Sequence, residues 1–323
     1  MDSAHVYYHG HCFDGVLSAA VIARFFRQRY GERCRIAFRG MTHRNRDPYG
    51  ANHAAFFDGS INAVVDFRYS PASSLNWWCD HHHTAFLSEE DRLAFERGDN
   101  PQHCFDPAAP SCAALLDRFL RDNHGFDGAD AVDLSWADRI DGAQFSSPKE
   151  PVELESPALR LMQLLESAPS WELEQRIITL LMERNIEAVE AAADVRQAVS
   201  NAVAQHTYTI SQVAERMKVE HGVAIVDLRD MAQVGINRYI PYYLSDELHY
   251  AVVLSAPTGR SKVGLSRNPW AERGQPLDLA TLAAEFGGGG HAAAAAVVFA
   301  SEDRAAVDRC AAKIAERLRM VDG

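Results

Sequence analysis

Regular structure begins with HVYYHGHCFDGVLSAAVIARFFRQRYG, residues 5–31, in which a short β-prone run leads straight into a helical pattern. The run HVYYH predicts a strand, and the apolar spacing from Asp14 through Arg29 predicts a helix that stops at Gly31. His9 and Asp14 lie on either side of the turn between the two. A strand that passes directly into a helix is typical of α/β folds, so this opening favours a parallel sheet with helical crossovers.

Three more strands are expected in the first third of the chain, in CRIAFRG (34–40), INAVVDF (61–67) and SLNWWCD (74–80). PSCAALLDRFLRDNHG, residues 110–125, predicts a helix with Pro in its first turn and Gly at its end. Ligands of parallel sheets bind beyond the carboxyl ends of the strands. His9, Asp66 and the string Asp80-His81-His82 each follow such a strand, so we expect them to meet at one edge of the sheet.

The second half of the chain has two parts, a helical segment and then a segment of alternating strands and helices. Residues 156–217 are rich in Ala, Leu, Glu and Gln, and they predict a helical connector in which residues 171–199 form one long helix. The segment that follows has four expected strands (GVAIVDL, HYAVVLSA, SKVGLS, AAAAAVVFA) and two expected helices (DLATLAAEF, EDRAAVDRCAAKIAERLRM). The predicted fold is therefore α/β, with a parallel-sheet domain over 1–155, the connector over 156–217 and a smaller C-terminal α/β domain over 218–323.

The composition is that of an ordinary soluble globular protein, with 47% hydrophobic and 24% charged residues. No apolar run approaches the length of a membrane span, and the N-terminus lacks a basic region followed by an apolar core. The six cysteines are scattered, without a CxxC pair. We therefore expect a reduced, cytoplasmic setting and no membrane partner.

The net charge of −12 argues against a protein that coats long nucleic acid. Residues 1–205 carry 19 Lys and Arg against 30 Asp and Glu, whereas residues 206–323 carry 13 against 14. The acidic half holds the Asp and His strings, as a site for divalent cations requires. An arginine-rich stretch from Arg24 to Arg46 interrupts this acidity, either as a solvated helix face and loop or as a phosphate contact.

The residues at the strand ends suit a pair of divalent cations. Mn²⁺ and Mg²⁺ prefer carboxylates, and Mn²⁺ tolerates imidazole better. Asp66 is the natural bridging ligand, because a carboxylate after a buried strand is costly without a cation or partner. We expect Asp14, His81 and Asp138 around it, with His9 at the first metal. Asp14 has an alternative role as a cap of the helix that it opens.

Four ordered motifs then lead to a family. They are HGHCFDGVLSAA at 9–20, VVDFRYS at 64–70, CDHH at 79–82 and WADRIDGA at 136–143, and VGLSR and DLATLAAEFGGGGHAAAAA follow in the C-terminal segment. Together these residues resemble the DHH phosphoesterase superfamily and its C-terminal domain with a GGGH loop. The resemblance covers almost the whole chain, and the first motif is most similar to the HxNCxDG variant. It implies a DHH-type catalytic domain over 1–155 and a substrate-binding domain over 218–323.

The resemblance also implies a role for each motif residue. The implied metal ligands are His9, Asp14, Asp66, His81 and Asp138, with Asp141 as the alternative to Asp138. Asp66 and His82 are the implied catalytic residues, and Asp80 supports the histidines. The implied substrate contacts are His82 on the scissile phosphate and, in the C-terminal domain, Arg267, Gly288, Gly289, Gly290 and His291. The implied cofactors are two divalent ions, with Mn²⁺ preferred and Mg²⁺, Fe²⁺ or Zn²⁺ as alternatives.

Two departures from the family pattern bear on the chemistry. Cys12 occupies a place that an aspartate usually holds, and a thiolate is a soft ligand that suits Mg²⁺ poorly. The first metal site is then weak, rebuilt from His9 and His11, or selective for another ion such as Zn²⁺ or Fe²⁺. The glycine usually found a few residues after GGGH is also replaced, within AAAAA.

The function expected from the resemblance and the acidic surface is that of a metal-dependent hydrolase of the oligoribonuclease type. It would cut short oligoribonucleotides or dinucleotides to mononucleotides, with a small nucleotide or short oligonucleotide as its partner. A phosphatase activity on 3′-phosphoadenosine phosphate and a homodimer are left open. The alternatives are a cyclic nucleotide, cyclic dinucleotide or polyphosphate hydrolase, or an inactive nucleotide sensor, which Cys12 motivates.

Overall fold

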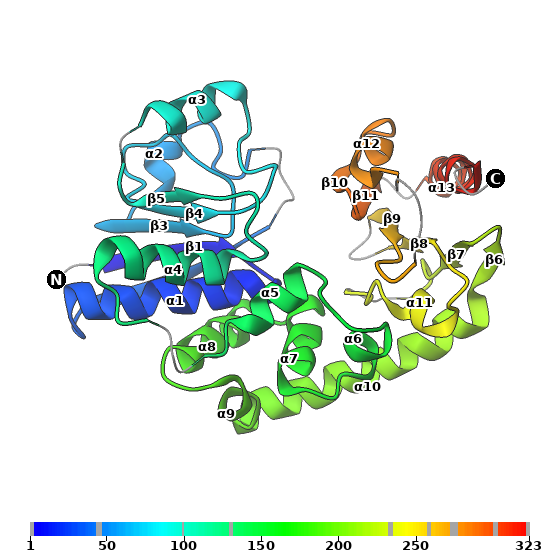
Figure 1. Ribbon diagram of the computed structural model, residues 1–323, viewed down its shortest axis with the longest axis horizontal. Coiled ribbons are helices and arrows are strands. Elements are labelled where there is room, and N and C mark those ends of the chain that lie inside the picture. Colours follow the sequence, from blue (N-terminus) through cyan, green and yellow to red (C-terminus); the bar gives the residue numbers. More distant parts are fainter. Residues whose placement is uncertain are drawn as a thin grey trace. The chain divides into compact units, whose positions relative to one another are not determined.

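The computed structural model describes residues 3–42, 47–98, 100–128, 132–231, 235–256, 260–271, 277–299 and 303–320. The chain divides into two compact units (Figure 1). Unit 1 comprises Met1–Gln144 and Ser156–Val199, and unit 2 comprises Phe145–Glu155 and Ser200–Gly323. Much of the segment predicted as a connector thus packs within unit 1, and the predicted domain bounds stay a prediction. None of the helices in the described ranges is long and apolar enough to cross a membrane.

Unit 1 is built on a five-stranded parallel sheet in the order β2-β1-β3-β4-β5. Its strands are β1 (Ser3–His9), β2 (Arg35–Met41), β3 (Ile61–Val65), β4 (Trp77–Asp80) and β5 (His103–Phe105). Its helices are α1 (Phe13–Tyr30), α2 (His53–Phe56), α3 (Glu89–Arg97), α4 (Cys112–His124), α5 (Ser135–Asp141), α7 (Pro157–Glu166), α8 (Trp171–Leu181) and α9 (Ile186–Glu190). The predicted α/β class and parallel sheet are confirmed, and β5 is a strand that the sequence patterns did not indicate.

Helices cover both faces of this sheet, so successive residues of the inner strands β3 and β4 are buried whichever face they point to. Helices α1 and α4 lie side by side along one face, and α2 and α3 lie over the other (Figure 1). Trp77 and Trp78 on β4 point to opposite faces, as successive strand residues do. Trp77 packs on Phe25 of α1 and Trp78 packs on Tyr69, each with ring centroids 4.9 Å apart. Both tryptophans are therefore core residues.

Strand register brings the polar strand ends level with one another. Val65 of β3 is paired with Tyr8 of β1 on one side and with Cys79 of β4 on the other. The next residue of each strand is His9, Asp66 or Asp80. Because the three strands are parallel, these residues lie in one row at the carboxyl edge of the sheet.

The prediction of one long helix over residues 171–199 was wrong. The segment forms α8, α9 and the start of α10 (Ala193–Arg216). The break follows from Asn185, whose extended backbone ends the preceding turn and whose side chain accepts a hydrogen bond from the Ala188 N–H at 2.9 Å. Asn competes in this way with the helix backbone, and the break lets Ile186 and Val189 of α9 reach the core.

Unit 2 holds a six-stranded mixed sheet in the order β10-β11-β9-β8-β7-β6. Its strands are β6 (Lys218–Glu220), β7 (Val223–Asp227), β8 (Tyr250–Ser255), β9 (Ser261–Arg267), β10 (Gly289–His291) and β11 (Ala294–Phe299). Its helices are α6 (Lys149–Glu153), α11 (Ile240–Leu244), α12 (Leu279–Ala284) and α13 (Arg304–Met320), with the later part of α10. Leu282 of α12 and Ile314 of α13 pack into the core on the sheet. The four predicted strands and two predicted helices are present, and β6 and β10 are additional.

Candidate metal centre

Acidic and imidazole side chains gather at the carboxyl edge of the unit 1 sheet. Three groups there could each hold a cation, because their ligand atoms all lie within 4.8 Å of one another. The groups are His9–Cys12–Asp66, Asp66–His81–His82 and Asp14–His81–Asp141. Asp66 and His81 each belong to two of them, so the three groups form one continuous cluster. We call it the edge cluster.

Asp66 lies at the centre of the edge cluster and is fully buried. Within the described part of the chain, neither of its carboxylate oxygens accepts a hydrogen bond. Its Oδ2 faces His9 Nδ1 at 3.4 Å, and its Oδ1 faces the ring nitrogens of His81 and His82 at 3.6 Å each. Burial, and after it the charge of Asp14, raises the pKa of Asp66 well above its usual range. A buried carboxylate in this state fits a bound cation, which supplies the missing counter-charge.

The backbone at Asp66 is also unusual. Its φ is +54°, in the left-handed region that non-glycine residues seldom adopt. The Asp66 N–H donates to the Cys79 carbonyl at 2.9 Å, which ties the residue to the neighbouring strand β4. This turn ends β3 and directs the carboxylate along the edge of the sheet rather than into either face. Strained backbone of this kind occurs often at functional sites.

His81 has the geometry of a metal ligand. Its Nδ1 lies 2.9 Å from the Ala109 carbonyl oxygen, an acceptor, so Nδ1 donates this hydrogen bond and Nε2 is the ring nitrogen left to bind a cation. Nε2 faces three carboxylates, with Asp141 Oδ2 at 3.4 Å, Asp66 Oδ1 at 3.6 Å and Asp14 Oδ2 at 3.7 Å. Three carboxylates around one lone pair form a donor set that suits a divalent ion.

The Asp14 carboxylate is fixed by the start of α4. Its Oδ2 accepts a hydrogen bond from the Cys112 N–H at 2.6 Å, and its Oδ1 accepts one from the Ala113 N–H at 2.9 Å. Burial and the charge of Asp141 nevertheless raise the pKa of Asp14 to about 7. Asp14 therefore does not cap its own helix α1. It ties α1 to α4 and presents its remaining lone pairs to the edge cluster.

Of the two aspartates on α5, the structure brings Asp141 and not Asp138 into the edge cluster. Asp141 Oδ2 faces His81, and its side chain is 31% exposed. Asp138 Oδ1 instead accepts a hydrogen bond from the Ser111 hydroxyl at 2.6 Å. Ser111 is the N-cap of α4, whose next two N–H groups hold Asp14. Asp138 thus supports the loop that positions Asp14.

Asp80 holds His82 rather than joining a candidate cation group. A single oxygen, Oδ1, lies 2.7 Å from His82 Nδ1 and accepts the backbone N–H groups of His81 and His82 at 2.8 and 3.2 Å. Burial of the ring lowers the pKa of His82, but the hydrogen bond and charge of Asp80 oppose it and raise the pKa to about 9. This arrangement agrees with the supporting role expected for Asp80.

Replacing Asp80 by asparagine is therefore expected to reduce kcat by about 10- to 100-fold without removing metal, because the His82 ring loses the negative charge that keeps its pKa raised. Turnover and metal content of the purified variant would be measured together. Asp58→Asn is the matched control, because Asp58 pairs with His5 at 2.8 Å near the amino ends of the strands. Equal rates for wild type and Asp80→Asn would remove Asp80 from the support of His82.

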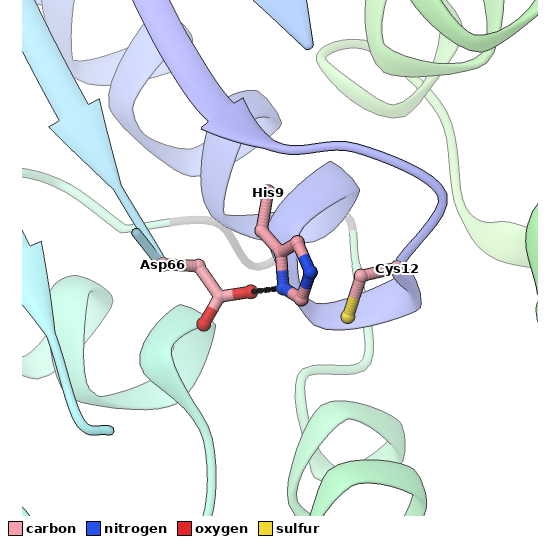
Figure 2. A group of neighbouring side chains, drawn as sticks. All are labelled: His9, Cys12 and Asp66. Carbon is pink, nitrogen blue, oxygen red and sulfur yellow. Dashed lines mark ion pairs between the residues drawn. The ribbon is translucent and has the colours of Figure 1, made fainter. Parts of the chain in front are cut away.

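The turn from β1 into α1 carries His9 and Cys12. A Cβ atom at Gly15 would lie 2.1 Å from the His9 carbonyl oxygen, so only glycine lets α1 start this close to the end of β1. Figure 2 shows the result: His9, Cys12 and Asp66 approach one another from the end of β1, the start of α1 and the end of β3. Sequence patterns predicted His9 and Asp66 for this place, and they left the role of Cys12 open.

His11, considered as a replacement ligand, is engaged elsewhere. Its Nδ1 lies 3.0 Å from Glu174 Oε2, its backbone N–H donates to the same carboxylate, and its ring stacks on Trp171 with centroids 4.3 Å apart. Glu174 is fully buried. The Trp171 ring also covers Gly10 and Gly40, where an added Cβ would approach it to 2.4 and 1.9 Å. Sequence reasoning missed Glu174 and Trp171, although an acidic residue on the apolar face of a predicted helix was a usable signal.

In unit 2, strand pairing brings the predicted substrate contacts to one end of the sheet. His291 of β10 pairs with Ala294 of β11, which pairs with Ser266, and Arg267 follows as the last residue of β9. Strand packing requires glycine at positions 288 and 290, because a Cβ atom there would lie 2.3 or 2.5 Å, respectively, from a carbonyl oxygen of β11. The roles of Arg267, Gly288, Gly289, Gly290 and His291 in substrate binding stay a prediction.

Similarity to known proteins was found among solved structures and not among sequences. No protein-family model and no curated protein sequence matched the chain. Among solved structures, PggH, a pGpG-specific phosphodiesterase from Vibrio cholerae, is similar with a TM-score of 0.64 and 19% identity, over 99% of this chain and 100% of that one. An exopolyphosphatase-related protein from Bacteroides fragilis is similar with a TM-score of 0.54 and 14% identity, over 99% of this chain and 93% of that one. The chain therefore shares the fold of these two proteins, which agrees with the α/β fold that its ordered motifs led us to expect.

Proposed function

We propose that this protein is a divalent-metal-dependent phosphodiesterase that hydrolyses dinucleotides and short oligoribonucleotides to mononucleotides. The observation that carries the proposal is the edge cluster, in which the buried Asp66 carboxylate faces histidines on both sides without accepting a hydrogen bond in the described residues. Such a carboxylate suits a bridging position between two cations. Its Oδ2 is directed to the His9–Cys12 side and its Oδ1 to the His81 side.

The ligand sets follow from the same geometry. We assign His9, Asp66 and the turn that carries Cys12 to a first ion, and Asp14, Asp66, His81 and Asp141 to a second. Asp141 replaces Asp138 in this assignment because Asp141 faces His81, whereas Asp138 faces Ser111. Mn²⁺ is the preferred second ion, because its ligands combine three carboxylates with one imidazole.

The chain's own residues then have separate tasks. When bound, two divalent ions supply a water that is ionised near neutral pH and positive charge beside the phosphoryl group. Asp66 directs one carboxylate oxygen toward His9 and the other toward His81. Asp80 engages Nδ1 of His82, so Nε2 of that ring is the atom that can meet a phosphoryl oxygen. This fixed group is already in position as charge develops on the phosphate, and so it costs no reorganisation.

The dinucleotide class is proposed from two observations. The net charge of −12 disfavours long nucleic acid strands. PggH, whose structural similarity covers 99% of this chain, is a phosphodiesterase specific for pGpG, a dinucleotide. An enzyme that acts on so small a substrate needs no extended basic surface.

Product analysis tests the proposal. The full-length protein with Mn²⁺ would be given pGpG, other linear dinucleotides, RNA of three to five and of many nucleotides, a cyclic dinucleotide, 3′-phosphoadenosine phosphate, pyrophosphate and polyphosphate. We expect mononucleotides from linear dinucleotides at a rate at least about 100-fold above that for long RNA, a difference of about 2.7 kcal/mol in the barrier. Cleavage of pyrophosphate or polyphosphate with dinucleotides untouched would overturn the proposal. Tight nucleotide binding without metal or turnover would identify a sensor instead.

A further inference from the structure

The two sides of the edge cluster offer different donor atoms. On the His81 side, the groups Asp66–His81–His82 and Asp14–His81–Asp141 offer only carboxylate oxygens and imidazole nitrogens. On the His9 side, the group is one imidazole, one carboxylate and the thiol of Cys12, whose ligand atoms lie within 4.8 Å of one another. Figure 2 shows the Cys12 sulfur on the same side of the turn as the His9 ring and the Asp66 carboxylate.

Cys12 lies at the start of α1, where its side chain can reach the edge cluster. It is the N-cap residue of α1, with extended backbone at φ −127° and ψ 136°, and its side chain makes no capping hydrogen bond. Its carbonyl accepts the first hydrogen bond of the helix from the Val16 N–H at 3.1 Å. Ser, Thr, Asp or Asn is favoured at an N-cap because the side chain oxygen caps the helix. Sulfur is a poorer cap than these oxygens, and the Cys12 sulfur lies within 4.8 Å of ligand atoms of Asp66 and His9.

Without a cation, burial and the charges of Asp66, Asp141 and Asp14 raise the pKa of the Cys12 thiol well above its usual range, so the thiolate needs a bound cation. The N-terminus of an 18-residue helix carries partial positive charge that stabilises an anion at the cap. A cation between Cys12, His9 and Asp66 adds a full positive charge at the sulfur. The thiol proton passes to the buffer as the metal–sulfur bond forms.

We propose that the Cys12 thiolate is a ligand of the first ion, and that this site selects a transition metal such as Zn²⁺, Fe²⁺ or Co²⁺ over Mg²⁺. Soft sulfur ligands favour these ions, whereas the oxygen-rich second site suits Mn²⁺ or Mg²⁺. The protein then holds two unlike ions on the two sides of Asp66. This inference rests on the proposed metal-dependent function, but it concerns the identity of a ligand and not the substrate.

Cobalt spectroscopy tests it independently of activity. The full-length protein would be stripped of metal with a chelator and titrated with Co²⁺, and sulfur-to-cobalt charge-transfer absorption would be followed in the near ultraviolet. We expect the band in the wild type and its loss in Cys12→Ser and Cys12→Asp. We also expect Cys12→Asp to bind Co²⁺ and Zn²⁺ at least about tenfold more weakly at one site, a difference of about 1.4 kcal/mol, and to gain affinity for Mn²⁺.

Cys112 provides the control, because its thiol is buried nearby and already donates to the Cys79 carbonyl at 3.3 Å. Cys112→Ala is expected to keep the band. Two bound Co²⁺ ions without the band, or a band that depends on Cys112 and not on Cys12, would overturn the proposal and leave dinucleotide hydrolysis intact. Failure of the wild type to bind any Co²⁺ would remove both this inference and the metal basis of the proposed function.

Discussion

Asp66→Asn is expected to reduce dinucleotide hydrolysis on the order of a thousandfold or more, because the variant loses the one carboxylate that faces both sides of the edge cluster. Asparagine matches aspartate in shape and is among the residues that tolerate the left-handed backbone found at this position, so the fold should survive. Activity would be measured together with metal content and circular dichroism. Both bound ions should be weakened, since both proposed sites share this side chain.

The same variant should be more stable than the wild type without metal and less stable with metal. Burial raises the pKa of Asp66, so in the metal-free protein near pH 7 the ionised carboxylate lowers the free energy of unfolding. Metal-free Asp66→Asn should therefore melt at a higher temperature than metal-free wild type, and the order should reverse once Mn²⁺ is added. Below the ordinary pKa of a free aspartate, the advantage of the metal-free variant should vanish. An Asp66→Asn protein with wild-type turnover would exclude Asp66 from the mechanism.

Asp141→Asn and Asp138→Asn form the second informative pair. Asp141 faces His81 at 3.4 Å, so its loss should remove one ion and reduce turnover on the order of a hundredfold. Asp138 accepts its hydrogen bond from the Ser111 hydroxyl, and the amide oxygen of an asparagine in its place can still accept that bond. We expect Asp138→Asn to retain both ions and to lose less than about tenfold in turnover.

Metal content measured by elemental analysis, with kcat, would separate the two aspartates. The substitutions remove the same charge from the same short helix, so each controls for the other. If Asp138→Asn lost an ion and Asp141→Asn retained both, the assignment of Asp141 to the second ion would be reversed.

The sequence was most informative where a strand ended. Tyr7, Tyr8 and Val65 belong to apolar runs, and a polar residue directly after such a run has only the carboxyl edge of the sheet to occupy. His9, Asp66 and His81 could therefore be assigned to one place from local patterns alone. Strand β5, with only three residues, gave no such pattern.

Asp138 and Asp141 show where that reasoning ends. Both lie on α5, three residues apart, and their side chains project about 60° from each other around the helix axis. The choice between them depends on how α5 is rotated against α1 and α4, and the motif alone does not define that rotation. Glu174 was missed for a related reason. Its partner His11 is 163 residues away in the sequence, and no local pattern connects them.

That contact has a consequence for the growing chain on the ribosome. The turn that carries His9 and Cys12 is synthesised early, but Trp171 and Glu174, which contact it, are added only after all five strands of the unit 1 sheet. A nascent chain that ends before α8 has the motifs of the edge cluster without the residues that fix this turn. We therefore expect a fragment ending at residue 155, which lacks both Trp171 and Glu174, to bind the first ion more weakly than the whole chain does.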